Sequence, residues 1–161
     1  MFIETNKAGK LKMCCVASSG GHWEELMCLK DVIESSECFF VTEQGGQAQE
    51  SKYSEMYLVT QINRHEKFFL LHFFRLFITA FRIIKKERPD IVLSTGALIA
   101  FPFCIVSKVF GAKIIFIESF ARVYNKSLTG KLIYPFSDLF IVQWETMMEH
   151  YPKAKYGGVV F

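Results

Sequence analysis

Several short motifs that would assign an activity directly are missing from this sequence of 161 residues. No Gly-Lys-Ser/Thr sequence occurs, which excludes a P-loop, and no Gly-x-Ser-x-Gly elbow occurs, which argues against a serine hydrolase. The five cysteines form no Cys-x-x-Cys pair and lie mostly in apolar runs, as reduced core residues of a cytosolic protein do. The four histidines lack metal-ligand spacing, so we expect no metal site.

Charge and targeting signals are equally sparse. The formal net charge is only +3 and no basic-aromatic recognition signature is present, so we expect no nucleic-acid partner. Residues 1–10 lack the apolar region of a signal peptide, which indicates a flexible N-terminal arm. No linker or internal repeat interrupts residues 11–161, and we expect these to form a single domain.

Short apolar runs alternate with helix-like stretches along the rest of the sequence. This alternation predicts an α/β fold, a Rossmann-like parallel sheet with helices on both faces. The expected strands are 12–17, 38–42, 56–59, 91–94, 113–118 and 139–143, and the expected helices are 22–35, 66–87, 101–110, 128–134 and 145–150. The runs Ile91–Leu93 and Ile114–Ile117 show no polar alternation, as is typical of strands buried on both faces.

Two glycine-containing loops follow predicted strands. Ser18-Ser19-Gly20-Gly21-His22 leads from the first strand into a helix, a geometry that lets backbone N–H groups approach an anion. A histidine at this position, His22, could accept a proton there. Thr95-Gly96-Ala97 is a second small-residue turn, at the end of another strand. Either loop taken alone is also compatible with an ordinary turn between a strand and a helix.

Two charged residues follow the fifth predicted strand. Glu118 is a candidate general base or hydroxyl-binding group, although it would equally suit a cap for the following turn. Arg122 is a candidate phosphate partner, although a solvated loop cation would have the same sequence. Because ligands of such folds bind beyond the carboxyl ends of the strands, we expect all these loops to converge on one edge of the sheet.

A nucleotide cofactor is a rival interpretation of the same edge. Glu43 lies 22 residues past Gly21, at the end of the second predicted strand, where a dinucleotide fold places its ribose-binding acid. The glycine loop lacks the Gly-x-Gly-x-x-Gly pattern, however, and this disfavours the cofactor.

The segment from Glu66 to Lys86 is rich in phenylalanine. Its polar residues recur every three or four positions and share a helical arc of about 80°; they are His72, Arg75, Thr79, Arg82 and Lys86. The remaining surface is apolar and wider than a helix needs to cover a sheet. Such a helix suits a membrane interface, with contacts through Phe69, Phe73, Arg75, Phe77, Arg82 and Lys86. A protein interface or burial in the core would also explain the apolar surface.

The sequence ends on an apolar stretch, although free termini are usually polar. The candidate partner contacts are Gly157, Gly158, Val159, Val160 and Phe161. Docking into the core of this domain is the alternative explanation for the same residues.

Four motifs, in this order, resemble the Alg14-like family, whose bacterial members are capsule and exopolysaccharide proteins of the PssD/CpsF type. They are Ser18–His22, Ser94–Ala97 followed by Pro102, Ile117–Ser119 and Asp138–Trp144. The resemblance covers about residues 11–161 and implies the N-terminal domain of a GT-B glycosyltransferase similar to MurG. It implies that both glycine loops face the diphosphate of a polyprenyl-diphosphate-linked sugar, with Arg122 as a further candidate contact. It makes His22 and Glu118 the candidate catalytic residues.

The resemblance further implies an enzyme of two chains. An Alg13-like catalytic subunit (PssE/CpsG type) would supply the UDP-sugar, and we expect no cofactor on this chain. This chain would be peripheral or monotopic at the cytoplasmic face of the cell membrane. A purely non-catalytic membrane adaptor for that partner is the alternative, and a free-standing nucleotide-cofactor protein is a third possibility.

Overall fold

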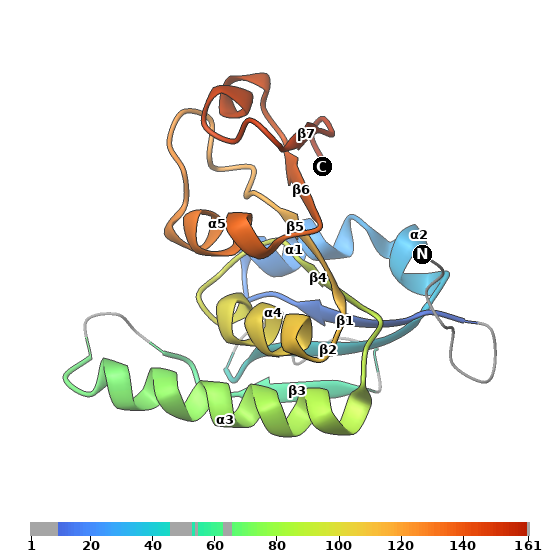
Figure 1. Cartoon of the computed structure of the whole chain (residues 1–161), viewed down its shortest axis with the longest axis vertical. Coiled ribbons are helices and arrows are strands. Elements are labelled where there is room, and N and C mark those ends of the chain that lie inside the picture. The colour runs from blue at the N-terminus through green and yellow to red at the C-terminus, as the bar shows by residue number, and fades with distance from the viewer. Residues whose placement is uncertain (1–9, 46–52, 54, 63–65, 161) are drawn as a thin grey trace.

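The computed structural model describes residues 10–45, 53, 55–62 and 66–160. Within them the strands form one sheet in the order β3-β2-β1-β4-β5-β6-β7, and every neighbouring pair is parallel (Figure 1). The strands are β1 Lys12–Val16, β2 Glu37–Glu43, β3 Met56–Val59, β4 Ile91–Ser94, β5 Lys113–Ile117, β6 Leu139–Val142 and β7 Lys155–Tyr156. The predicted Rossmann-like parallel sheet is confirmed. The apolar pattern does not predict β7, since its two residues are exposed.

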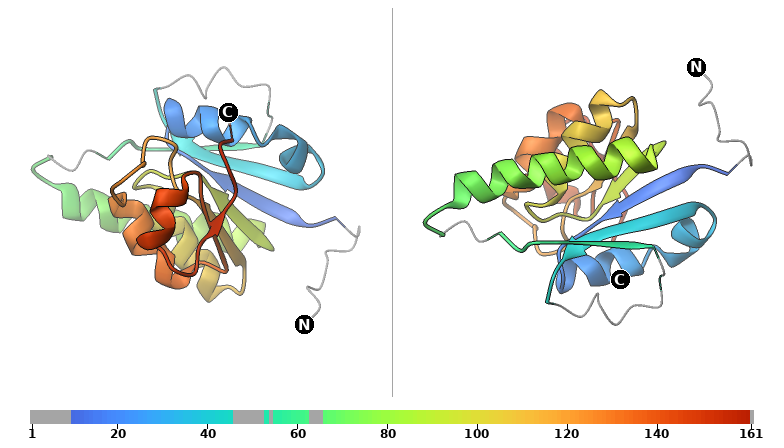
Figure 2. Two further views of the ribbon diagram at one scale, coloured as in Figure 1. Left: turned by 90° about the horizontal axis from the view of Figure 1, so that it is seen from above. Right: turned by 90° about the horizontal axis from the view of Figure 1, so that it is seen from below.

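Helices cover both faces of the sheet, as predicted (Figure 2). α1 Gly21–Met27 and α2 Lys30–Glu34 lie on one face, and α3 Phe69–Glu87, α4 Ala100–Val109 and α5 Leu128–Ile133 lie on the other. Short 3₁₀ turns occupy Tyr134–Phe136 and Glu145–Glu149. The helix expected over 22–35 is thus two helices separated at Cys28 and Leu29, and the one expected over 145–150 is a 3₁₀ turn.

Side chains of the central strands alternate between two apolar layers, as strand geometry requires. Cys14 and Val16 of β1 pack in the layer that contains α3 and α4, whereas Met13 and Cys15 pack in the layer that contains α1 and α2. Burial on both faces explains why these strands carry no polar alternation. Cys14, Cys15 and Cys104 are buried free thiols, as expected, whereas Cys38 is half-buried and Cys28 is exposed, so Cys28 is not a core residue. Burial raises the pKa of Cys104 to about 12.

The direction in which successive strands are added to the sheet changes at β1. The chain runs outward from β1 to β2 and β3, and then returns to the other side of β1 to form β4. The carboxyl ends of β1 and β4 therefore lie side by side, at the kind of switch point where open α/β sheets bind their ligands.

Candidate functional site

Two of the predicted loops meet at this switch point. The hydroxyl of Thr95 donates a 2.6 Å hydrogen bond to the backbone carbonyl of His22, which joins the loop after β4 to the start of α1. These loops and the segment after β5 border a hollow of about 190 Å³. Its lining residues are His22, Gly96, Ala97, Ser119, Ala121, Arg122, Ser127, Leu128 and Thr129.

The hollow brings together several residues that the sequence analysis predicts for the site. Four of them line it directly, namely His22, Gly96, Ala97 and Arg122. The exposed Arg122 adds a positive charge at the rim. Thr95 is buried and acts through its bond to His22. The turn Ser18–Gly21 leads into α1 immediately before His22 and lies outside the lining.

The imidazole of His22 lies against the backbone of Gly96. A Cβ atom placed on Gly96 would come within 2.6 Å of Cε1 and 2.8 Å of Nδ1 of the ring. Gly96 also has φ 131°, in the region that side chains disfavour, and the next residue, Ala97, has φ 74°. A left-handed residue with a Cβ costs roughly 1–3 kcal/mol and is found mostly where function holds it in place. The loop after β4 is therefore shaped around His22.

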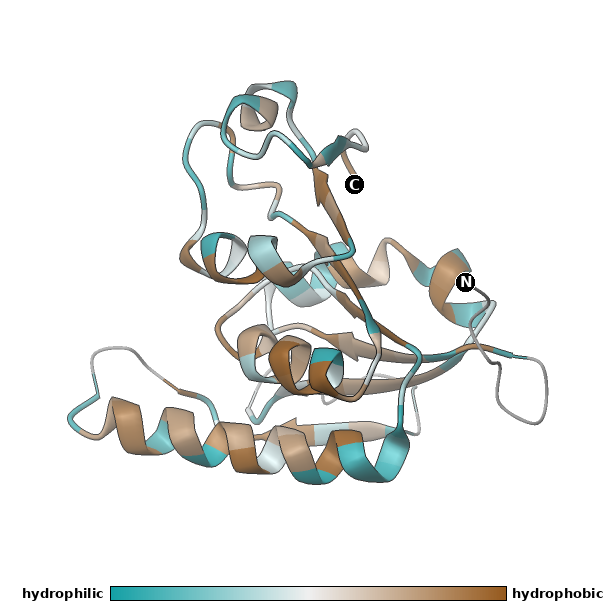
Figure 3. Cartoon of the chain, in the orientation of Figure 1, coloured by the Kyte–Doolittle hydropathy of each residue, from teal (hydrophilic) through white to brown (hydrophobic). Residues whose placement is uncertain are grey.

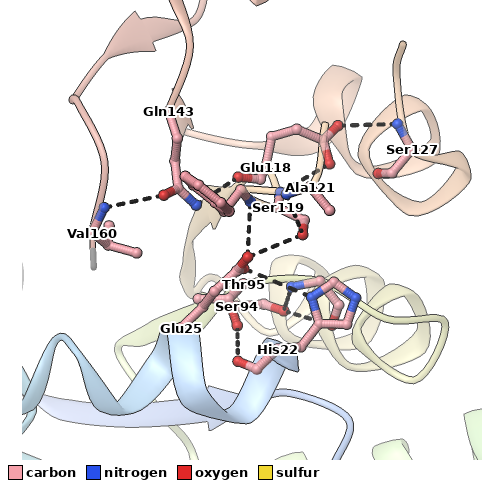
Figure 4. A network of polar contacts seen from close by, with 12 residues as sticks. His22, Glu25, Ser94, Thr95, Glu118, Ser119, Ala121, Ser127, Gln143 and Val160 are labelled. Atoms are coloured by element: carbon pink, nitrogen blue, oxygen red, sulfur yellow. Dashed lines mark hydrogen bonds and ion pairs between the residues drawn. The ribbon is translucent and has the colours of Figure 1, made fainter. Parts of the chain in front are cut away.

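A buried carboxylate, Glu25, faces His22 from the next turn of α1. Its side chain is only 4% exposed, and its Oε1 atom accepts hydrogen bonds from the hydroxyl of Ser119 (3.0 Å) and the backbone N–H of Phe120 (2.8 Å; Figure 4). Its Oε2 atom lies 3.8 Å from Nδ1 of His22. No motif in the sequence singles out Glu25. Its spacing of three from His22 places both on one helix face, and this is the only available signal.

Glu118 is buried directly after β5. Its side chain is 1% exposed, and its carboxylate accepts hydrogen bonds from the hydroxyl of Tyr151 (2.7 Å) and the backbone N–H groups of Ser119 (3.1 Å) and Ser127 (3.3 Å). Burial, together with the Glu118 carboxylate, raises the pKa of Tyr151, so this phenol stays a donor. These hydrogen bonds fit the cap interpretation, in which Glu118 positions the segment after β5.

Glu43 ends β2 near His22. Burial raises the pKa of this carboxyl, and the nearby His22 together with a backbone hydrogen bond from Ile62 partly offsets the rise. The side chain is 9% exposed. A carboxylate buried in this way is not presented to the hydroxyls of a ribose, so the structure gives the nucleotide interpretation no support here.

The helix α3 carries both hydrophobic and hydrophilic residues along its length (Figure 3). Its exposed large apolar residues are Leu70, Leu71, Phe74, Ile78 and Phe81, which follow one another at helical spacing. We call these five residues the apolar stripe. Exposed Arg75, Arg82 and Lys86 lie at helical positions along one side of it. Within the described residues, no helix is long and apolar enough to cross a membrane.

Three phenylalanines of α3 are predicted for membrane contact. Phe69, Phe73 and Phe77 are half-buried, and the rings of Phe73 and Phe77 lie 6.3 and 6.1 Å from that of Phe101 on α4. Phe73 and Phe77 thus pack α3 against α4. The periodicity of the sequence identifies the helix correctly, but residue type alone does not show which side of that helix is exposed.

The C-terminal segment docks partly on its own domain. The backbone N–H of Gly157 donates to the carbonyl of Val142 (3.0 Å), and that of Val160 donates to Oε1 of Gln143 (3.1 Å). The amide of Gln143 also donates to the backbone carbonyl of Glu118 (3.1 Å). Val159 remains 44% exposed, and Phe161 lies outside the described residues. Gln143 thus links the segment to the loop that borders the hollow.

Comparisons with known proteins agree with this architecture. The family model described as "Oligosaccharide biosynthesis protein Alg14 like" matches residues 42–160. A UDP-N-acetylglucosamine transferase subunit ALG14 from Rattus norvegicus is 38% identical over 85 residues, which span 49% of this chain and 39% of that protein. The subunit of the same name from Mus musculus is 29% identical over 178 residues, covering 92% of this chain and 82% of the mouse protein. The match to the rat relative thus spans about two fifths of that protein's length.

Solved structures share the fold. The MurG structure from Acinetobacter baumannii superposes with a TM-score of 0.75 at 13% sequence identity, covering 94% of this chain and 46% of the MurG chain. At this identity the likeness shows the fold alone. The shared unit is a Rossmann-like domain of the GT-B N-terminal type.

Proposed function

Because the chain belongs to the Alg14-like family of oligosaccharide biosynthesis proteins, we propose that it is the acceptor-side subunit of a two-chain glycosyltransferase. The observation that carries this proposal is the hollow at the switch point, where His22 lies against Gly96 and Arg122 occupies the rim. A proton acceptor beside a cation suits a substrate that has both a reacting hydroxyl and a diphosphate. The names of the rat and mouse relatives support a transferase subunit.

The substrate that fits this proposal is a sugar linked to polyprenyl diphosphate. Arg122 and the backbone of the glycine loops would orient the diphosphate, and a sugar hydroxyl would lie near His22. That hydroxyl attacks the anomeric carbon of a UDP-sugar, a new glycosidic bond forms, and the bond from the anomeric carbon to UDP breaks. The hydroxyl proton passes to His22. This chain carries no cofactor in the proposal, because the UDP-sugar binds to the partner.

The partner would be an Alg13-like catalytic chain. The fold match covers 46% of the MurG chain, and the donor-side domain in this proposal belongs to the partner. The Gly157–Val160 segment, with its exposed Val159, is the proposed contact on this side. A role in capsule or exopolysaccharide synthesis is the corresponding biological proposal.

The apolar stripe is the proposed site of membrane contact, at the cytoplasmic face. Exposed apolar side chains at helical spacing would enter the boundary between headgroups and acyl chains, while Arg75 and Arg82 meet anionic headgroups. Peripheral binding of this kind would bring the hollow to a lipid-linked substrate without a spanning helix.

Reconstitution tests this proposal. The chain is co-expressed with an Alg13-like protein from the same source, purified, and incubated with a polyprenyl-diphosphate-linked sugar and a set of UDP-sugars beginning with UDP-N-acetylglucosamine. We expect transfer by the pair and little or none by either chain alone. No complex, or a complex that is inactive with every donor and acceptor pair, would count against the proposal.

A further inference from the structure

We infer that Glu25 is a positioning residue for His22, holding the imidazole with its proton on Nδ1 so that Nε2 is left to accept a proton in the hollow. The inference deepens the proposed function and rests on it for the catalytic step. It needs no group beyond those the chain provides.

Two buried polar atoms in this part of the chain face each other without partners. Oε2 of Glu25 and Nδ1 of His22 are both shielded from solvent, and neither has a hydrogen-bond partner, although they are only 3.8 Å apart. An approach of less than about 1 Å would make an ordinary N–H···O hydrogen bond. Buried polar groups are nearly always paired, so these two atoms are each other's natural partner.

The ring is oriented so that only one nitrogen is left for a substrate. Nδ1 is buried on the side of Glu25, while the side chain of His22 as a whole remains 31% exposed and lines the hollow. A carboxylate next to Nδ1 favours the tautomer with the proton on that nitrogen. Nε2 then has a free lone pair, as a proton acceptor requires.

Glu25 is itself held rigidly. Its other oxygen accepts hydrogen bonds from the hydroxyl of Ser119 and the backbone N–H of Phe120, both in the segment after β5 (Figure 4). The same carboxylate therefore joins three parts of the site: α1, the segment after β5, and the imidazole. Because it has these donors, it has little freedom to turn away from His22.

Other charged groups around His22 do not replace Glu25. Glu43 at the end of β2 is the second carboxylate near the ring, and the exposed Arg122 is a cation that lines the hollow. When the substrate hydroxyl gives its proton to Nε2, the ring becomes an imidazolium with the Glu25 carboxylate beside it. The ion pair stabilises the charge that develops on His22 during transfer.

The variant Glu25→Gln separates this role from a merely structural one. The amide oxygen of glutamine can still accept from Ser119 and Phe120, so the segment after β5 keeps its anchor. In that orientation the amide N–H₂ group of the glutamine faces Nδ1 of His22. Because this group can only donate, Nδ1 must accept, and the tautomer with the proton on Nε2 is favoured. If Glu25 only anchors the segment after β5, the Glu25→Gln protein should behave almost like the unmodified protein. If Glu25 positions His22, the variant should fold but carry the imidazole proton on Nε2 instead of Nδ1.

Two measurements test the inference. In the reconstituted pair, we expect Glu25→Gln to lower kcat by roughly 100-fold, within the effect of about 10²–10⁴ that proton transfer contributes, with KM values nearly unchanged. The double variant His22→Ala with Glu25→Gln should be no slower than His22→Ala alone, because both substitutions remove the same function. Glu24→Gln on the exposed side of α1 is the matched control and should behave like the unmodified protein.

The second measurement does not require activity. Nitrogen-15 NMR of the full chain with labelled histidine should show His22 protonated at Nδ1 above neutral pH, and protonated at Nε2 in Glu25→Gln. An unchanged kcat together with unchanged ring nitrogen shifts would overturn the inference. An inactive unmodified pair would instead count against the proposed function, while the tautomer measurement would still decide the role of Glu25.

Discussion

Thr95 and His22 are joined across the switch point by a hydrogen bond of 2.6 Å from a side-chain hydroxyl to a backbone carbonyl. The two residues are 73 positions apart in the sequence. The bond fixes the start of α1 to the loop after β4, and so fixes the direction from which the imidazole enters the hollow. The active geometry of the proposed site depends on this contact between two loops.

Replacing Thr95 by valine removes that contact while keeping the shape of the side chain. We expect a loss of about 1 kcal/mol in the free energy of unfolding, typical of a single hydrogen bond. Because His22 shifts, we expect transferase activity to fall by more than this loss of stability explains. Urea unfolding and initial-rate measurements check this. Thr79→Val is the matched control, since its hydroxyl only bonds to the carbonyl of Arg75 on the same helix. Equal effects of the two substitutions on activity would refute the role of the contact between loops.

Gly96 tolerates no side chain if His22 is to keep its position. Gly96→Ala would place a Cβ 2.6 Å from the ring, so we expect the imidazole to move and activity to fall steeply. Gly111→Ala is the control, because Gly111 also has a positive φ (91°) but nothing lies within 4 Å of its added Cβ. Each variant should lose roughly 1 kcal/mol or more in stability for the strained backbone. Only Gly96→Ala should lose activity; comparable activity in both would show that contact with the ring is unimportant.

Charge reversal on α3 tests the membrane contact. Arg75→Glu together with Arg82→Glu should reduce binding to vesicles containing anionic lipid by at least tenfold, since each basic residue near such a surface contributes about 1 kcal/mol. Flotation through a density gradient measures it. The control is Lys30→Glu with Lys131→Glu, which makes the same change in net charge on exposed residues of α2 and α5. Identical flotation of the two double variants would exclude a specific role for the α3 cations.

Acid should destabilise the domain partly through Glu87. Partial burial opposes ionisation of this carboxyl, but hydrogen bonds from Lys12, Tyr57 and Lys86 outweigh it and lower its pKa to about 2 from an ordinary value of 4.5. A carboxyl with a lowered folded-state pKa contributes stability that is complete above pH 4.5 and is lost as the pH falls toward 2. The difference in unfolding free energy between the unmodified chain and Glu87→Gln should therefore shrink over that range. A difference that stays constant from pH 7 to pH 2.5 would contradict the assignment.

The sequence predicts the sheet well because buried parallel strands have a strong local signature. Ile91–Ser94 and Met56–Val59 have the same bounds in prediction and structure, since unbroken apolar runs mark them clearly. β7 has no such run: its two exposed residues pair with β6 only because the chain is brought back along that strand. Elements held by tertiary contacts alone leave little trace in local sequence.

The site is predictable in outline but not in its chemistry. Strand-end loops converge because the topology requires it, so His22, Gly96 and Arg122 are brought together as expected. Glu25 and Glu118 are both buried, but only Glu25 lies on α1 next to His22, whereas the partners of Glu118 are Ser119, Ser127 and Tyr151. The contact of Glu25 with Ser119 spans 94 residues, and no local pattern reports it.

The central claim is that His22 takes part in sugar transfer. The most direct test is the initial rate of His22→Ala in the reconstituted pair, with a polyprenyl-diphosphate-linked acceptor and the donor found to be active. We predict a fall of at least about 100-fold, with an intact complex by size-exclusion chromatography. An unchanged rate with an intact complex would contradict the account, and would make this chain a non-catalytic membrane adaptor.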